Sequence, residues 1–268
     1  MNTNTMNNDV NNSRQSHFAF IAGVVSALAV VAIIGFAFCV GMWFAGKKER
    51  NNDKDIHDAY DKVQLWEGGP YWAAKNIGAD KPEDDGCYFW WGDTVGYYKP
   101  VLDSWVASDE SMSNFSFSED NTPIYRKRIF ELKSEGWIEK KNGTHVLTSK
   151  YDAAQAHLGG AWRMPTKGEF DDLVEKCEWT WTTRNGKNGY VVRGRGNYAS
   201  KSIFLPAAGD GYGASLGLYD SYGGYWSSVP LSGSYTAYVL NFHSGGRYTN
   251  YYYRYYGQSV RPVQGFTK

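Results

Sequence analysis

Residues 18–45 form an apolar run without a single charged side chain. About 20 residues of helix span the hydrocarbon core of a bilayer, and a helix lets a spanning backbone satisfy its own hydrogen bonds. The run therefore predicts one transmembrane helix over residues 17–46. A cleaved signal peptide is the alternative, but the run is longer than the roughly 7–15 residues of its apolar region. We expect residues 1–16, which are Asn-rich, to be disordered, and residues 47–65 to form a charged linker.

The charges beside the apolar run bear on its orientation. Among the basic residues, Arg14 alone precedes the run, whereas Lys47, Lys48, Arg50 and Lys54 follow it. Because cytoplasmic flanks are rich in Lys and Arg, this difference favours a cytoplasmic C-terminal domain. A binding domain that faces outward needs the opposite orientation. We expect a single-pass membrane protein with an extracytoplasmic domain, on grounds of function and against the flanking charges.

Residues 66–268 have the pattern of a domain with many short strands. Runs rich in aromatic and β-branched residues are bounded by Gly and Asp, which is typical of strands and turns. These runs are residues 71–79, 86–98, 179–183, 190–192, 202–209, 224–228, 237–242 and 259–263. The dipeptide Asn142–Gly143 predicts a hairpin within residues 137–148. The formal net charge is zero and basic clusters are few, which argues against nucleic acid as a partner.

Three segments have helical patterns. Two are short, residues 124–134 and 151–158. The third begins with a capping box, in which Thr166 is the N-cap and Glu169 lies three residues on. An apolar face at helical spacing follows, made of Phe170, Leu173, Val174 and Cys177. Short strands with few helices predict an α+β fold.

The three cysteines, Cys39, Cys87 and Cys177, lie far apart. They form no CxxC motif and no Cys–His cluster with zinc-ligand spacing. Cys39 lies in the apolar run, so a disulfide between Cys87 and Cys177 is one alternative and two buried free thiols are the other. The place of Cys177 on the apolar helix face favours free thiols. We expect no cofactor and no functional metal site, while a structural calcium ion near Asp93 stays open.

Several motifs occur in the order of a known family. Within residues 71–264 the chain contains, in sequence, WAAKNIGADKPEDDGCYFWWGDT, YDAAQAHLGGAWRMPT, SIFLPAAG, GGYWSS and GQSVRPV. It thereby resembles the Fibrobacter succinogenes major paralogous domain, which is related to the formylglycine-generating enzymes. The resemblance implies a C-type-lectin-like fold with short twisted antiparallel strands and two helices, here preceded by one transmembrane helix. Cys87 and the divergent residues 99–149 depart from the family pattern.

Tyrosine is concentrated near the C-terminus. Eleven of the 21 tyrosines lie within residues 219–256, and six of the nine residues 248–256 are tyrosine. This segment resembles the variable segment of target proteins of diversity-generating retroelements, whose variable positions derive largely from asparagine codons. The resemblance implies a variable ligand-binding segment over about residues 219–258, with Gly257 and Arg261 in its framework. It rests on Tyr248, Asn250, Tyr251, Tyr252, Tyr253, Tyr255 and Tyr256.

Physical chemistry gives a separate expectation for the same segment. In a strand over residues 237–243, alternation places Tyr238, Leu240 and Phe242 toward the core, which leaves Asn241 and His243 free to point toward a ligand. Residues 248–256 show no alternation, and six tyrosines cannot all bury satisfied hydroxyls in so short a run. We therefore expect most of them to be exposed, as clustered aromatics at interaction sites are. Tyr225 and Trp226 are expected in the core.

The sequence thus predicts a membrane-anchored receptor or adhesin-like protein that binds a macromolecular ligand, either protein or glycan. The expected ligand-binding residues are Tyr235, Asn241, His243, Arg247, Tyr248, Asn250, Tyr251, Tyr252, Tyr253, Arg254, Tyr255 and Tyr256. A structural module of the cell envelope is the alternative. An enzyme like the formylglycine-generating enzymes is a further one, but those enzymes use a late cysteine pair and no cysteine follows Cys177. We expect no catalytic residues.

Overall fold

The structure, a computed structural model, describes residues 61–98 and 104–265. The predictions for residues 1–16 and 17–46, and for most of the linker over 47–65, lie outside these ranges. Among the helices of the described ranges, none is long and apolar enough to cross a membrane.

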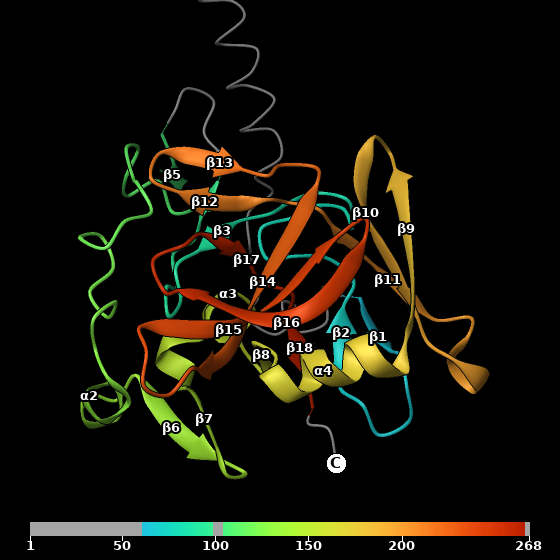
Figure 1. The fold of residues 1–268 in the computed structure, drawn as a ribbon, viewed down its shortest axis with the longest axis horizontal. Coiled ribbons are helices and arrows are strands. Elements are labelled where there is room, and N and C mark those ends of the chain that lie inside the picture. Colours follow the sequence, from blue (N-terminus) through green and yellow to red (C-terminus); the bar gives the residue numbers. More distant parts are fainter. Residues whose placement is uncertain (1–60, 99–103, 266–268) are drawn as a thin grey trace, which may run out of the picture. The chain divides into compact units, whose positions relative to one another are not determined.

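A seven-stranded sheet runs through the described domain (Figure 1). Its strands are, in spatial order, β16 (Gly246–Tyr253), β15 (Thr236–His243), β14 (Tyr222–Pro230), β17 (Gln258–Ser259), β3 (Tyr88–Phe89), β4 (Tyr97–Tyr98) and β5 (Val106–Ala107). Neighbouring strands are antiparallel except β14 and β17, which are parallel. All nine residues of β14 are buried, which makes it the central strand of the core.

Smaller sheets accompany the large one. A four-stranded sheet has the order β1 (Lys62–Gln64), β2 (Tyr71–Ala73), β18 (Val263–Gln264) and β8 (Trp162–Arg163), and a three-stranded sheet the order β11 (Ser202–Pro206), β10 (Lys187–Arg193) and β9 (Glu178–Arg184). Two hairpins complete the set, β12 (Asp210–Tyr212) with β13 (Ser215–Gly217) and β6 (Ile138–Lys141) with β7 (Thr144–Leu147). The β6–β7 hairpin confirms the predicted turn, since Asn142 and Gly143 have φ values of 47° and 85°.

The described helices are short: α2 (Ile129–Ser134), α3 (Ala153–Leu158) and α4 (Lys167–Lys176), with 3₁₀ turns at Ser149–Tyr151 and Gly196–Tyr198. The capping box of α4 is confirmed, because the Thr166 hydroxyl accepts from the Glu169 amide and the Glu169 side chain accepts from the Thr166 amide. The helix predicted over residues 124–134 starts only at Ile129. Its first part is turned, and the Ile124 and Lys127 carbonyls accept hydrogen bonds from a distant arginine instead.

Three clusters of buried side chains form the core, and β15 separates two of them. Leu240 and Phe242 pack in a cluster that contains Tyr225, whereas Ala237 and Val239 pack in a cluster that contains Trp226. The third cluster surrounds Tyr88 and Trp105. The predicted burial of Tyr225 and Trp226 is confirmed, and both faces of β15 are covered. Cys87 and Cys177 belong to different clusters and are free thiols, which excludes the disulfide between them.

The described domain is rich in strands and has few helices, which agrees with the predicted α+β class at this coarse level. Some predicted strands are shorter than expected. Within residues 71–79 only Tyr71–Ala73 is a strand, because the buried Asn76 holds the next residues irregular through bonds to the Asp85 carbonyl and the Arg261 guanidinium. Residues 248–256 lack alternation in the sequence, and the first part of this segment, residues 248–253, lies in β16.

Candidate functional site

The motifs GGYWSS and GQSVRPV meet at the base of the β15–β16 hairpin. Tyr225 in β14 lies beside Ser259 in β17, in the parallel pair of the sheet. A Cβ atom on Gly224 would lie 1.8 Å from Oε1 of Gln258, and one on Gly223 would lie 2.1 Å from the Phe242 ring. Each glycine of the first motif therefore makes room for a specific side chain. The hairpin thus starts after β14 and ends before β17, two strands that lie side by side.

Buried hydrogen bonds fix this base. The indole of Trp226 donates to the Phe89 carbonyl at 2.7 Å, and the Tyr225 hydroxyl donates to the Pro206 carbonyl at 3.0 Å. The buried Arg261 guanidinium donates to the carbonyls of Ala73 and Phe204 at 3.0 and 2.8 Å. Because these bonds reach three distant segments, the frame around the hairpin is tied to the whole domain. The predicted framework role of Arg261 agrees with this burial.

The expectation for Asn241 is wrong, because its side chain is completely buried. Asn241 lies opposite Gly224, over which the Gln258 side chain packs, and the face of β15 expected to be open is covered. Within the described residues, neither buried amide has a hydrogen-bond partner. Asn241 therefore lies beneath the surface as part of the packing. His243, two residues on, is exposed as expected, and its Nδ1 accepts from the Gly245 amide at 3.1 Å.

Arg254 is also misplaced by the sequence prediction. It is completely buried, and its guanidinium donates to the carbonyls of Ile124, Lys127 and Ser234 at 3.3, 2.6 and 3.3 Å. The guanidinium also lies 5.2 Å from the Trp91 ring centre. Burial lowers the pKa of Arg254 from 12.5 to about 10. Arg254 thus holds the end of β16 against two loops and does not reach the surface.

Three tyrosines of β16 are the most exposed part of the predicted site. Tyr248, Tyr251 and Tyr253 expose 45%, 54% and 47% of their surface. Alternation places Tyr248 on one face of the strand and the other two on the opposite face. Asn250 and Tyr252 are half-buried, and the Tyr252 hydroxyl accepts a hydrogen bond from that of Tyr222 at 3.2 Å.

A ring cluster continues this surface beyond the end of β16. Tyr255 lies 5.5 Å from Tyr253 and 5.1 Å from Tyr256 between ring centres, and 4.8 Å from Tyr125. We call the set the tyrosine cluster; its members are Tyr125, Tyr212, Tyr235, Tyr252, Tyr253, Tyr255 and Tyr256. Tyr255 itself is buried, contrary to expectation, because its neighbours cover its ring. Burial raises the pKa of the Tyr255 and Tyr256 hydroxyls.

Sequence reasoning missed Tyr125 and Tyr212. Tyr125 lies in the turned segment before α2, and Tyr212 ends β12, where 56% of it is exposed. Both come from parts of the chain far from residues 248–256, so only the fold brings them together. Arg247, which was predicted, is half-buried and places its guanidinium 5.7 Å from the Trp179 ring centre.

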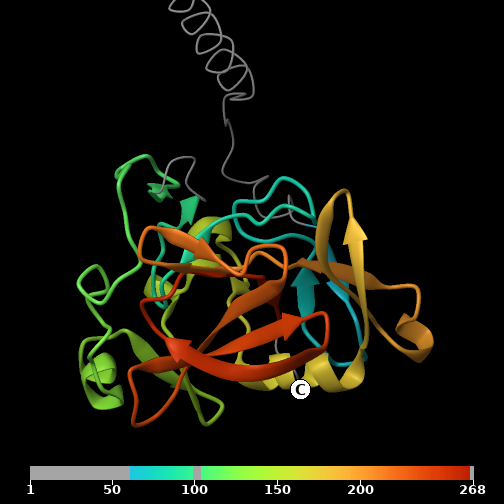
Figure 2. The ribbon, with the colours of Figure 1, turned by 45° about the horizontal axis from the view of Figure 1, so that its top comes forward.

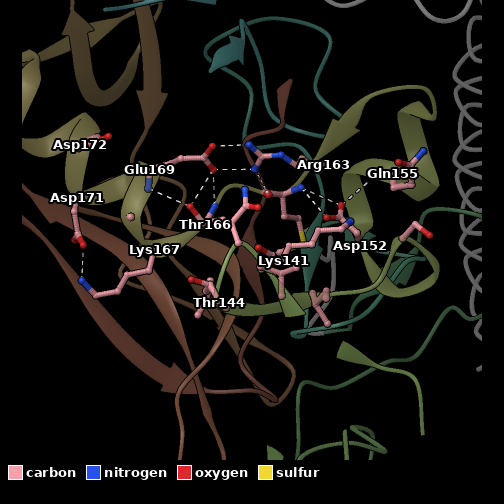
Figure 3. Close-up of a pocket in the computed structure, with 18 residues that line it drawn as sticks. Lys141, Thr144, Asp152, Gln155, Arg163, Thr166, Lys167, Glu169, Asp171 and Asp172 are labelled. Atoms are coloured by element: carbon pink, nitrogen blue, oxygen red, sulfur yellow. Dashed lines mark hydrogen bonds and ion pairs between the residues drawn. The ribbon is translucent and has the colours of Figure 1, made fainter. Parts of the chain in front are cut away.

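A second hollow, of about 500 Å³, lies between the β6–β7 hairpin, α3 and the start of α4 (Figure 3). Its charged groups form ion pairs or accept hydrogen bonds from backbone amides. Arg163 binds Glu169 at 2.8 Å, and the Asp152 carboxylate accepts backbone amides of Ala154 and Met164. Figure 3 shows these pairs beside Thr166.

Metal ligation has little support in the described residues, which contain no group of three or more His, Cys, Asp or Glu side chains placed to hold an ion. The Asp93 carboxylate, near which calcium was considered, accepts hydrogen bonds from the amides of Val95 and Gly96 at 2.9 and 3.0 Å. Its place in this turn accounts for its burial.

Comparisons with known proteins bear on the second half of the chain. No curated protein and no solved structure shows significant similarity to the chain. Residues 165–263 match the family described as "Domain of unknown function (DUF8237)". This match starts just before α4 and ends in β18, so it includes β14, the β15–β16 hairpin and both motifs at its base.

Proposed function

We propose that this chain is a membrane-anchored binding protein of the receptor or adhesin kind, held by residues 18–45. In this proposal a C-type-lectin-like scaffold, as in the Fibrobacter succinogenes major paralogous domain, carries a recognition surface made of the β16 tyrosines and the tyrosine cluster. The surface is diversified by a retroelement and binds a macromolecular ligand outside the cytoplasm.

The contrast between the hairpin and its base carries the proposal. GGYWSS and GQSVRPV are buried throughout, whereas Tyr248, Tyr251 and Tyr253 between them are about half exposed. On a scaffold of this kind, sequence variation is confined to side chains whose replacement leaves no cavity in the core. Loss of a half-exposed side chain outside the core changes stability little.

The chemistry of the surface suits recognition. Tyrosine supplies a large, stiff contact area at small entropic cost, and its hydroxyl both donates and accepts hydrogen bonds. Arg247 adds a cation near the start of β16, and His243 adds an exposed ring at the end of β15. Rings of this kind are enriched among the residues that dominate binding energy.

The thiols support a binding role over catalysis by a cysteine pair. Cys87 and Cys177 are buried, and burial raises the pKa of each to about 12. A reactive cysteine needs an accessible thiolate, which these environments disfavour.

A triple variant tests the recognition surface. Ligands are first selected on the full-length protein in detergent micelles, by peptide display and by a glycan array. The variant that combines Tyr248→Ala, Tyr251→Ala and Tyr253→Ala should no longer bind them. Tyr71→Ala is the matched control, since Tyr71 is 42% exposed and belongs to another sheet. Both proteins should keep a wild-type Tm. Selected ligands that bind the triple variant as well as wild type would refute the proposal.

Retroelement diversification has its own test. The DNA near the gene should contain a reverse transcriptase gene and a near-copy of the last codons that differs at adenines. Without both, that part of the proposal fails while the binding surface stands. Protease treatment of intact cells tests orientation, because a domain that survives until lysis is cytoplasmic.

A further inference from the structure

The outer edge of β16 is an unpaired strand edge. β16 is the last strand on its side of the seven-stranded sheet (Figure 2). It is eight residues long and pairs with β15 without a shift in register. Natural sheets protect such edges with Pro, Lys or a bulge, since an open edge pairs with other chains. β16 has no Pro, Lys or bulge; its one charged residue is Arg247, and α4 packs beside Thr249 on one face of the strand. The edge between the two faces is a place where a strand can add.

The register identifies the backbone groups that point outward. The Arg254 amide donates to the Tyr235 carbonyl at 3.2 Å, and alternate pairs of an antiparallel ladder are hydrogen-bonded. Counting back along β16, the backbone of Tyr252, Asn250 and Tyr248 faces β15. The backbone of Tyr251, Thr249 and Arg247 therefore faces outward, and within the described residues no backbone hydrogen bond from outside the strand ladders reaches these amides and carbonyls.

Side chains flank this edge on both faces. Tyr251 is exposed on one face and Tyr248 on the other, so a strand that pairs with β16 passes between two sets of rings. Arg247 stands near the start of the edge. Its Nε is buried and has no hydrogen-bond partner in the described part of the chain, and its guanidinium lies over the Trp179 ring. The half-buried side chain therefore leaves only its outer part for an incoming carboxylate.

We propose that the ligand is bound as an extended protein segment that pairs with the outer edge of β16 and places an acidic side chain against Arg247. This inference rests on the function proposed above and names the partner class of the same site. Main-chain hydrogen bonds supply affinity in such strand addition, and the flanking side chains supply specificity. The edge thus offers a contact that replacement of the tyrosines leaves in place.

A second copy of this chain fits the edge less well. Two β16 strands could pair about a twofold axis, but β16 contains no Asp or Glu, so a second β16 cannot place a carboxylate of its own beside Arg247. α4 lies against one face of β16, where Asp171 accepts a hydrogen bond from the Thr249 hydroxyl at 2.7 Å. A twofold axis that pairs two β16 strands would therefore bring two α4 helices to the same side of the strand pair. A glycan lacks the alternating amides and carbonyls that match the edge.

Replacement of Thr249 separates the backbone from the side chains. Thr249→Pro removes one outward amide, at an edge position where proline is tolerated. Thr249→Val is the matched control, since both variants lose the hydroxyl bond to Asp171 and only proline loses the amide. The probe is a phage-displayed library of random linear peptides, selected on the full-length protein in detergent micelles.

We expect the selected peptides to carry Asp or Glu and to bind Thr249→Pro about tenfold more weakly than Thr249→Val. Arg247→Gln should weaken acidic peptides similarly. Peptides with N-methyl groups at alternate residues test the same bonds from the ligand side, and they decide the matter if Thr249→Pro does not fold.

Several outcomes would overturn the inference. Equal binding to the proline and valine variants, together with unimpaired N-methylated peptides, would refute strand pairing. If the triple tyrosine variant still lost those peptides, the proposed function would survive. Peptides that bind the triple variant as well as wild type but lose affinity for Thr249→Pro would refute the tyrosine recognition surface and leave the strand pairing in place. Failure to enrich any peptide would also count against strand pairing with a protein segment. If the wild-type protein is a dimer and Thr249→Pro is a monomer, the edge binds a second copy of this chain instead.

Discussion

Arg254→Met gives the sharpest test of the structure, because the sequence places this residue in the ligand site and the fold places it in the core. Its guanidinium makes three hydrogen bonds to carbonyls. Hydrogen bonds from a charged group contribute about 1.5–3 kcal/mol each. Opposing them, burial lowers the Arg254 pKa from 12.5 to about 10, which corresponds to about 3 kcal/mol. We expect a net loss of about 3 kcal/mol on substitution, within the range for a broken buried network.

The assay is thermal unfolding of the full-length protein in detergent, followed by tryptophan fluorescence. For a domain of this size the loss corresponds to a Tm lower by roughly 6–12 °C. Arg247→Met is the matched control. It removes a half-buried guanidinium that contacts the Trp179 ring, so its effect should stay within about 1 kcal/mol. A wild-type Tm for Arg254→Met combined with lost ligand binding would show that Arg254 is a contact residue and that its buried placement is wrong.

Two further substitutions test the close packing at Gly223 and the buried carboxyl of Asp210 in β12. Gly223→Ala should lower the free energy of unfolding in urea by about 1–3 kcal/mol, because the new Cβ would lie 2.1 Å from the Phe242 ring. Gly168→Ala is the control: its Cβ would meet only Thr166 Oγ1 at 4.0 Å, so stability should stay unchanged or rise slightly. An equal loss of stability in both variants would contradict the packing at Gly223. Asp210 is buried, which raises its pKa to about 6 in the folded protein from 3.8. The folded state then holds the extra proton, so between pH 4 and 6 this group should make stability fall as pH rises, with a slope of up to ~1.4 kcal/mol per pH unit that Asp210→Asn abolishes.

Local patterns in the sequence predicted the parts of the fold that depend on neighbouring residues. The capping box of α4, the Asn142–Gly143 turn and the burial of Trp226 need only short-range information, and all are confirmed. Residues 124–134 show where this fails. Their apolar spacing is helical, yet the Ile124 carbonyl bonds to Arg254, which lies far along the chain.

The site shows the same division. The exposure of the β16 tyrosines follows from their number in one short run. The burial of Asn241 does not, because it depends on Gln258 packing over Gly224 from another strand. An arginine within a tyrosine run looks like a contact residue until the three carbonyls around Arg254 are known. Tyr125 and Tyr212 join the cluster only through long-range folding.

The parallel pairing of β14 with β17 has a consequence for chain length. Because β14 and β17 are adjacent buried strands, residues 231–257 between them form a loop in the chain whose two ends are held in place. The entropy of closing such a loop grows only with the logarithm of its length. Residues inserted at the turn over 231–235 or at 244–245 should therefore move neither motif. In such a fold the length of the recognition hairpin can change as readily as its side chains.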